Sequence, residues 1–155
     1  MSETSLQDTY APNSVCFGCG PANKHGLHIK SRVERGKVVA DWRPEGRYAA
    51  FEGYLNGGII GVLLDCHSNW AAAYSLMKEL GLPRPPATVT ARYSVLFHRP
   101  TPLDSTIHLE STPTRRWKDK VSVVTTLSSG DVVTATFTGT FVMVREGHPA
   151  FGRWK

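Results

Sequence analysis

LNGGIIGVLLDCHSNWAAA, residues 55–73, is an almost continuous apolar run with one carboxylate, Asp65, in its middle. The run continues without a proline to about Lys78, and its leucine, alanine, methionine, lysine and glutamate content favours helix. We therefore predict a helix from Gly58 to about Lys78. A helix that is apolar on most of its circumference belongs inside a protein, so the rest of the chain should be organised around it.

The start of this helix has the features of a site for an anion or a developing negative charge. Asn56 is a good N-cap residue, and Gly57 and Gly58 leave the free backbone N–H groups of the first turn unshielded. Asp65 lies about two turns further along, with Asn69 on the same face. A buried carboxylate has to be hydrogen-bonded, paired or used in chemistry. The structural alternative is a tight glycine turn before a core helix with one satisfied polar residue.

Length and composition restrict the classes of protein that need to be considered. The chain has 155 residues, of which 41% are hydrophobic and 20% charged, as expected for one globular domain. We find no repeat, transmembrane run or signal peptide, and we expect a cytoplasmic protein with no membrane partner. Three cysteines, an odd number, argue against a disulfide scaffold. The net charge of +5 is scattered, so a phosphate-bearing small molecule suits it as well as nucleic acid.

A CxxC motif, Cys16-Phe17-Gly18-Cys19-Gly20, lies near the N-terminus, and no second CxxC follows it. Structural zinc normally takes four protein ligands, so a metal site here would need His25, His28 or a second subunit. A redox pair is a further alternative. We interpret the motif as a glycine-rich turn with two packed thiols, and expect no metal and no cofactor.

The remaining segments predict an antiparallel α+β layer fold in which a sheet curves around the helix. In residues 87–97, strand alternation places Val89, Ala91, Tyr93, Val95 and Phe97 on one face and Thr88, Thr90, Arg92 and Ser94 on the other. The expected elements are a mobile arm over 1–14, two strands over 27–33 and 38–42, a loop over 43–55, the helix, a four-strand meander over 87–97, 105–113, 121–127 and 132–144, and a polar tail over 145–155.

Together these motifs resemble the hotdog fold, specifically the PaaI-like (phenylacetate-pathway) branch of the acyl-CoA thioesterase superfamily. The resemblance covers about residues 15–144 and implies an antiparallel sheet wrapped around one long central helix. It also implies subunits that pair their sheets edge to edge, as a homodimer or dimer of dimers, with an active site between subunits. The matching residues are Cys16–Gly20 with Asn23 and Gly26-Leu27, Gly57–Ile60, Leu63–Asp65 and Phe97–Pro100.

The resemblance also assigns roles within the site. It implies that the backbone N–H of Gly57, helped by Gly58, polarises the thioester carbonyl, and that Asp65 activates water or attacks directly. Thr90 and Asn69 would position water. Where the family usually has a histidine before the two glycines, this chain has Asn56, which cannot titrate near neutral pH. The candidates for holding the phosphates of CoA are basic residues: Arg92, Arg99 and Arg116, with Arg115 and Lys118 as further choices.

We therefore predict hydrolysis of acyl-CoA thioesters, a chemistry that needs an oxyanion hole and a base but no metal. One alternative is a non-catalytic hotdog module that binds an acyl thioester or another hydrophobic ligand. A dehydratase-like hotdog and a nucleic-acid module are weaker hypotheses. His67 points away from the Asp65 face and is expected in the core or an interface. Five aromatic residues, Trp42, Tyr48, Phe51, Tyr54 and Trp70, suggest a small or aromatic acyl group.

Overall fold

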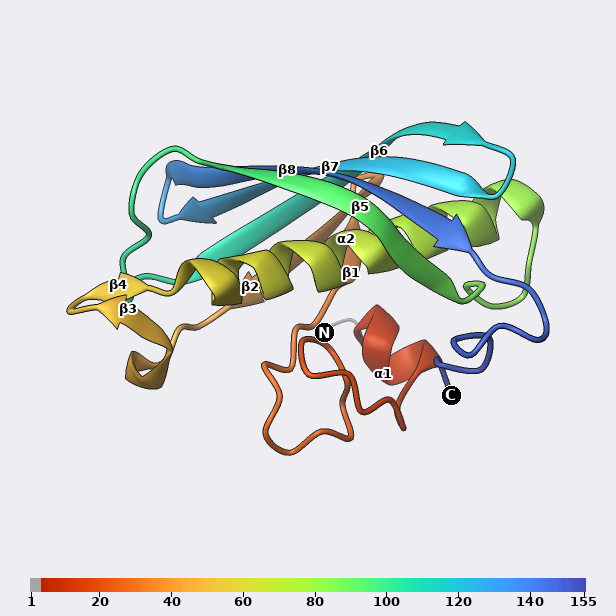
Figure 1. The fold of residues 1–155 in the computed structure, drawn as a ribbon, viewed down its shortest axis with the longest axis horizontal. Helices are drawn as coiled ribbons and strands as arrows, with labels where there is room; N and C mark the ends of the chain where they lie inside the picture. Colours follow the sequence, from red (N-terminus) through yellow and green to blue (C-terminus); the bar gives the residue numbers. More distant parts are fainter. Residues whose placement is uncertain (1–3) are drawn as a thin grey trace.

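The computed structural model describes residues 4–155 and consists of a curved antiparallel sheet packed on one long helix (Figure 1). A short helix precedes the sheet, and a two-stranded hairpin leads into the long helix. The elements in chain order are α1 (Leu6–Tyr10), β1 (Arg32–Glu34), β2 (Lys37–Trp42), β3 (Ala49–Phe51), β4 (Tyr54–Leu55), α2 (Gly57–Leu80), β5 (Thr88–Phe97), β6 (Ile107–Trp117), β7 (Lys120–Ser129) and β8 (Val132–Met143).

The two ends of helix α2 are set by its capping residues, Asn56 and Gly81. The side chain of Asn56 accepts hydrogen bonds from the first turn, and Gly81 ends the helix in the left-handed conformation, with φ of 64°. Twelve of the 24 residues of α2 are buried, including Leu63, Leu64 and Trp70. The predicted central helix is therefore confirmed, with ends within two residues of the prediction.

The main sheet has the strand order β1-β2-β6-β7-β8-β5. Strands β6, β7 and β8 form a meander, but β5 does not join it through β6. Instead β5 pairs with β8, at the far side of the meander, so that β5 is an edge strand. The predicted four-strand meander is therefore wrong in this respect, because the connection from β5 to β6 crosses to the other side of the β7–β8 pair.

A bulge in β5 changes which side chains face α2. Thr90 pairs with Phe141 and Arg92 pairs with Thr140, so Ala91 is the extra residue. Thr90 therefore points toward the helix, as Phe141 does. Beyond the bulge the alternation is reversed, and the Tyr93 ring packs at a tilt against the core residue Phe137, with 5.2 Å between ring centroids. The strict alternation predicted for residues 87–97 is therefore wrong, since it places Thr90 and Tyr93 on opposite faces.

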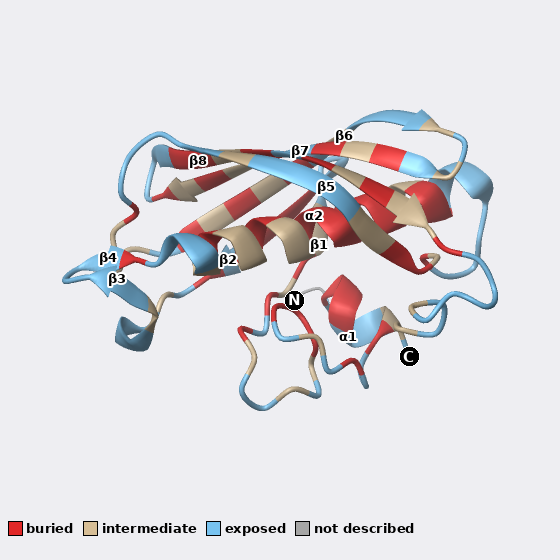
Figure 2. Cartoon of the chain, viewed as in Figure 1, coloured by how far each residue is buried: buried red, intermediate tan, exposed pale blue. Residues whose placement is uncertain are grey.

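The face of α2 turned away from the sheet is covered by the two ends of the chain (Figure 2). Leu27 and Ile29 are buried there, although they lie in an irregular segment before β1, with φ of 54° at His28, and not in the predicted strand. The expectation of a mobile arm over 1–14 is wrong for residues 4–14. Leu6 and Gln7 of α1 are buried, and the Gln7 side chain bonds the backbone N–H and the hydroxyl of Ser31.

The C-terminal segment also packs on this face. The ring of Trp154 stacks on the buried ring of Trp70, with 4.3 Å between centroids, and the carbonyl of Lys155 accepts a hydrogen bond from the N–H of Asn13. Residues 1–3 lie outside the described part of the chain. Within that part, no helix has the length and apolar character needed to cross a membrane.

Candidate active site

Asp65 lies on α2 opposite the edge strand β5, where Thr90 holds its carboxylate. The hydroxyl of Thr90 donates to Asp65 Oδ1 at 2.7 Å. Burial raises the pKa of the Asp65 carboxyl above its usual value, while the Thr90 hydrogen bond and the charge of Arg153 act in the opposite direction. A half-buried carboxylate with one oxygen fixed by a hydroxyl is suited to accept a proton from water.

The tip of α2 presents one free backbone donor. Asn56 Oδ1 accepts from the N–H of Gly58 at 2.7 Å and from the N–H of Ile59 at 3.2 Å. The N–H of Gly57, the first residue of the helix, has no acceptor among the hydrogen bonds of residues 4–155. The N–H of Gly58 is already bonded to the Asn56 side chain. Of the two glycines, therefore, only Gly57 can donate its N–H to a ligand.

A cavity of about 450 Å³ opens at this helix tip. Gly57 lies at its wall, and Arg99 is the one cation of the predicted trio that lines it. The aromatic side chains of Phe51, Tyr54 and Phe97 also line it. The cavity therefore combines an apolar wall, one cation and the free N–H of the helix tip, which are features of a small-molecule site.

The donor and the carboxylate of one chain are too far apart to act together. Gly57 and Asp65 are eight residues apart on one helix, which is about 12 Å at 1.5 Å per residue. A carbonyl bound at Gly57 is therefore out of reach of the same chain's Asp65. Within one chain, these two groups therefore cannot act on the same carbonyl.

Asn69 lies one turn beyond Asp65, as predicted, and contacts β5. Its amide donates to the carbonyl of Thr88 at 3.3 Å, and the hydroxyl of Thr88 donates to its Oδ1. These two bonds hold the start of β5 against α2, and so set the position of Thr90. A further role of Asn69 in holding water stays a prediction.

The structure separates the three predicted arginines. Arg99 lines the cavity at the helix tip, whereas Arg92 lies beyond the bulge on the outer face of the sheet, beside Ser122 and Thr140. Arg116 is paired with Glu79, near the opposite end of α2. Of these three arginines of one chain, only Arg99 is close to the helix tip.

Arg153 is a site residue that the sequence analysis missed. Its guanidinium donates to the carbonyl of Thr88 at 2.9 Å, and its charge acts on the nearby Asp65 carboxylate. The stacking of Trp154 holds this segment in place. The only signal in the sequence was a tryptophan near the end of a polar segment, and this does not reveal which surface it covers.

His67 is confirmed as a core residue. It is fully buried, and its Nε2–H donates to the carbonyl of Val38 at 2.9 Å. Its Nδ1 is thereby left to accept from the hydroxyl of Ser31 at 2.8 Å. Burial lowers the pKa of His67 to about 4, so the ring is neutral and fully satisfied.

Comparisons with known proteins bear on the fold. No family model matches the sequence, and no curated protein matches it. Solved structures do match. A thioesterase superfamily protein from Shewanella loihica PV-4 is 25% identical, with a TM-score of 0.66, over 81% of this chain and 98% of that one.

Two further neighbours carry phenylacetic acid degradation in their descriptions. A putative thioesterase of this kind from Ralstonia eutropha JMP134 is 22% identical, with a TM-score of 0.61, over 76% of this chain and 86% of that one. The E. coli PaaI protein from the phenylacetic acid degradation operon is 15% identical, with a TM-score of 0.64, over 77% and 81%.

The chain therefore has the hotdog fold of the thioesterase superfamily, as the sequence predicted. The two neighbours described by phenylacetic acid degradation share this fold.

Proposed function

We propose that the protein hydrolyses acyl-CoA thioesters at a site completed by two copies of the chain. The observation that carries this proposal is the hydrogen bond of 2.7 Å between Thr90 and Asp65, which fixes a half-buried carboxylate opposite the edge strand. Thioesterase superfamily neighbours with the same fold support this choice of reaction.

The proposed reaction uses the two groups in sequence. Asp65 takes a proton from water as the oxygen attacks the carbonyl carbon, and the N–H of Gly57 from the other copy donates to the developing oxyanion. The tetrahedral intermediate then collapses, the carbon–sulfur bond breaks, and the CoA thiolate leaves and takes up a proton. Direct attack by Asp65, with a covalent anhydride intermediate, is the alternative for the first step.

The pairing of two copies follows from the open edge of the sheet. Strand β5 has one hydrogen-bonded neighbour and carries exposed apolar side chains: Tyr93, Leu96 and Phe97 are 48%, 66% and 56% exposed. An unpaired apolar edge strand invites pairing with a second chain. Pairing along β5 brings a second copy to the strand that carries Thr90, and we propose a homodimer, alone or as half of a tetramer.

The acyl group is proposed to occupy the cavity at the helix tip. Of the five aromatic residues considered from the sequence, Phe51 and Tyr54 line this cavity, which favours a short or aromatic acyl group. Trp42 and Trp70 are buried in the core and do not shorten it. Arg99, at the cavity wall, is the proposed contact for a phosphate of CoA. The predicted cytoplasmic location, and the absence of nucleic-acid and membrane partners, stay predictions.

The first prediction concerns the carboxylate. We expect Asp65→Asn to lower kcat for free-thiol release from acyl-CoA esters by about 10²–10⁴-fold, because the amide keeps the shape but cannot accept the proton. A panel of short, long and aromatic esters measures this. Asp131→Asn, the same change in an exposed hairpin turn, is the control and should retain full activity. Unchanged turnover in Asp65→Asn would exclude the proposed mechanism.

A second candidate function is a non-catalytic module that binds an acyl thioester. The observation that favours it is Asn56, which lies where the resemblance expects a histidine and which is used as the helix cap. Thermal stabilisation by acyl-CoA without any thiol release, from a protein shown to be folded and oligomeric, would establish this candidate in place of the enzyme.

A further inference from the structure

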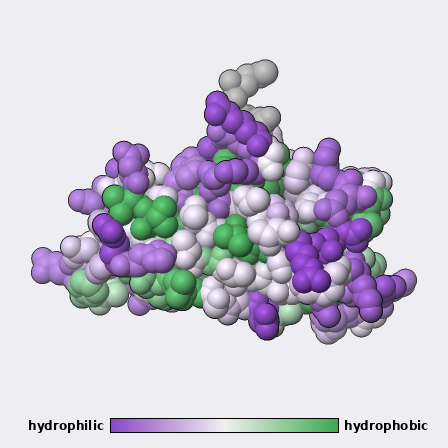
Figure 3. All heavy atoms as spheres, turned by 90° about the horizontal axis from the view of Figure 1, so that it is seen from above, coloured by the Kyte–Doolittle hydropathy of each residue, from purple (hydrophilic) through white to green (hydrophobic). Residues whose placement is uncertain are grey.

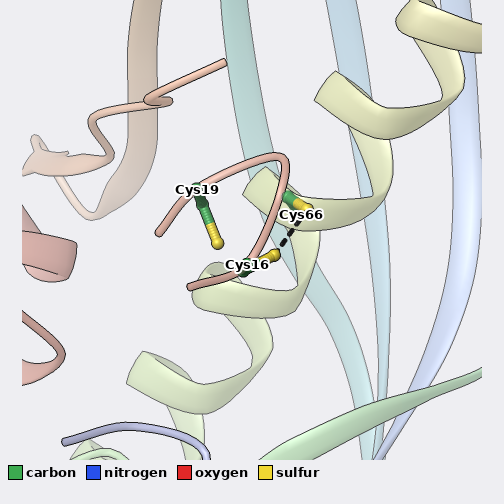
Figure 4. A group of neighbouring side chains, drawn as sticks. All are labelled: Cys16, Cys19 and Cys66. Carbon is green, nitrogen blue, oxygen red and sulfur yellow. Dashed lines mark hydrogen bonds between the residues drawn. The ribbon is translucent and has the colours of Figure 1, made fainter. Parts of the chain in front are cut away.

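Three thiols meet beside α2, although they come from distant parts of the sequence (Figure 4). Cys16 and Cys19 lie in the N-terminal loop, and Cys66 lies in α2. Their sulfur atoms are all within 4.8 Å of one another, and the sulfurs of Cys16 and Cys66 are 3.7 Å apart. The sequence analysis considered only histidines or a second subunit as further ligands of the CxxC motif. It did not foresee the third thiol.

The loop is built so that the thiols can approach. A Cβ atom at Gly18 would lie 2.3 Å from the sulfur of Cys66, and a Cβ at Gly20 would lie 2.4 Å from the backbone N of Cys16. No side chain fits at either position. The two glycines therefore allow the loop to place its cysteines directly against the helix. A glycine-rich turn with two packed thiols, as interpreted from the sequence, would not require so close an approach.

One N–H donor from α2 reaches the sulfur cluster. The indole N–H of Trp70 donates to the sulfur of Cys19 at 3.3 Å. The sulfurs of Cys16 and Cys66, at 3.7 Å, are themselves within hydrogen-bond distance of each other.

We propose that Cys16, Cys19 and Cys66 bind a Zn²⁺ ion through three thiolates. Zinc–sulfur bonds of about 2.3 Å in a tetrahedral site separate neighbouring sulfurs by about 3.8 Å, close to the 3.7 Å between Cys16 and Cys66. As the three bonds form, each thiol that still carries a proton releases it to solvent. Soft thiolate donors select zinc over magnesium or calcium.

A cavity lies next to the cluster, on the side of Cys16. Cys16 lines a cavity of about 600 Å³ together with Arg153 and Lys155, so water has access to the metal from that side. Zn²⁺ with three thiolates has a net charge of −1, and these two cations partly offset it. The site joins the N-terminal loop to α2 next to Asp65, and it does not depend on the proposed hydrolysis.

The test is metal binding by the reduced full-length protein. We expect one Zn²⁺ per chain by elemental analysis, a lower Tm after chelation, and the charge-transfer and tetrahedral d–d absorption of thiolate ligands on substitution with Co²⁺. Cys66→Ser should lose the metal, whereas His28→Ala should keep it, because the His28 ring bonds the carbonyl of Asn23. Trp70→Phe should weaken zinc binding by about 10–100-fold, since it removes the donor to Cys19 but keeps an aromatic ring.

Two results would overturn the proposal. One is a reduced protein that takes up no Zn²⁺ or Co²⁺ at micromolar concentrations. The other is zinc binding with the same affinity in Cys66→Ser as in the wild type. Should Cys66→Ser fail to fold, the Co²⁺ spectrum of the wild type decides, because its charge-transfer intensity reports the number of thiolates. A Cys16–Cys66 disulfide in the isolated protein, with no metal after reduction, would identify a redox pair instead.

Discussion

Gly57 and Gly58 look equivalent in the sequence, but the structure gives them different tasks. The Asn56 side chain accepts the N–H of Gly58 and leaves that of Gly57 free. The backbone of Asn56, with φ of −62° and ψ of 133°, is compatible with a following proline. The donor at position 57 can therefore be removed by a substitution that the first helical position tolerates.

We expect Gly57→Pro to lower kcat for thioester hydrolysis by about 10²–10³-fold, since it deletes the N–H that the oxyanion would accept. Gly57→Ala is the matched control. It keeps the N–H, and its Cβ would only reach the Phe97 ring at 3.7 Å, an ordinary contact. Free-thiol release and thermal unfolding would be measured side by side. Equal activity in the two variants would show that the helix tip is not the oxyanion hole.

His67 allows a prediction on charge. Its pKa of about 4 in the folded protein lies below the ordinary value of 6.5, because burial disfavours the charged ring. The unfolded chain therefore binds the proton first, and stability is lost as the pH falls from about 6.5 through 4. NMR titration of the ring should show no protonation of His67 at pH 5.5. A midpoint near 6.5 for His67 would contradict the burial argument.

At the scale of single residues, the sequence identified those functional groups that can be recognised from their neighbours along the chain. A carboxylate inside an apolar helix and two glycines at its start can be recognised without a structure, and so can the cap formed by Asn56. The role of Arg153 and the place of Cys66 could not be predicted, because each depends on which distant segment covers α2. The resemblance placed Thr90 in the site only as a residue that positions water, and its hydrogen bond to Asp65 was not predicted. The alternation pattern alone would have turned Thr90 away from the helix.

At the scale of elements, the helix was predicted well and the sheet only in part. Helix ends follow from Asn56 and Gly81, whose effects are local. Strand order is decided by long-range packing, so the place of β5 beside β8 could not be derived from alternation. The strand predicted over 105–113 is longer in the structure, where β6 extends to Trp117. Residues 27–31 before β1 alternate in burial as a strand does, but His28 has a positive φ of 54° and the segment does not join the sheet.

The C-terminal segment behaves as an element, although it has no regular structure. We expect Trp154→Ala to lower the free energy of unfolding by about 1–3 kcal/mol, because it removes the stacking on Trp70. At this chain length that corresponds to a fall in Tm of roughly 2–12 °C. Phe151→Ala, which removes a half-exposed ring three residues earlier, is the control and should change Tm little. Equal effects of the two substitutions would mean that Trp154 does not hold the segment.

At the scale of the whole molecule, the two broad surfaces of the sheet layer differ. The face away from α2 is pale over much of its area in Figure 3, with small apolar patches among polar ones. Its side chains include many of intermediate polarity, such as Ser122, Thr126, Thr136 and Thr138. The open side of β5, in contrast, combines unpaired backbone with large apolar side chains. The open edge of β5, and not the outer face of the sheet, is therefore the surface at which we propose that a second copy pairs.

We expect Leu96→Glu to weaken the dimer by at least about tenfold in Kd, equivalent to about 1.4 kcal/mol, because it places a charge at the paired edge. Val124→Glu, on the outer face of β7 and two strands from that edge, should leave the dimer intact. Light scattering over a concentration series measures both. A wild type that is monomeric at all concentrations would contradict the two-copy site, and an active monomer would contradict the proposed mechanism as well.

The bulge at Ala91 has a consequence for how β5 tolerates changes in length. The strand has two phases: Thr88 and Thr90 face the helix in the first, and Tyr93, Val95 and Phe97 face it in the second. Removing the one extra residue would make the hydrogen-bond ladder more regular but would destabilise the protein. One of the two sets of side chains would then have to turn from the helix face of the sheet to its outer face. Any single substitution in β5 affects one contact, whereas this deletion would separate the hydroxyl that holds the carboxylate from the aromatic residues that close the core.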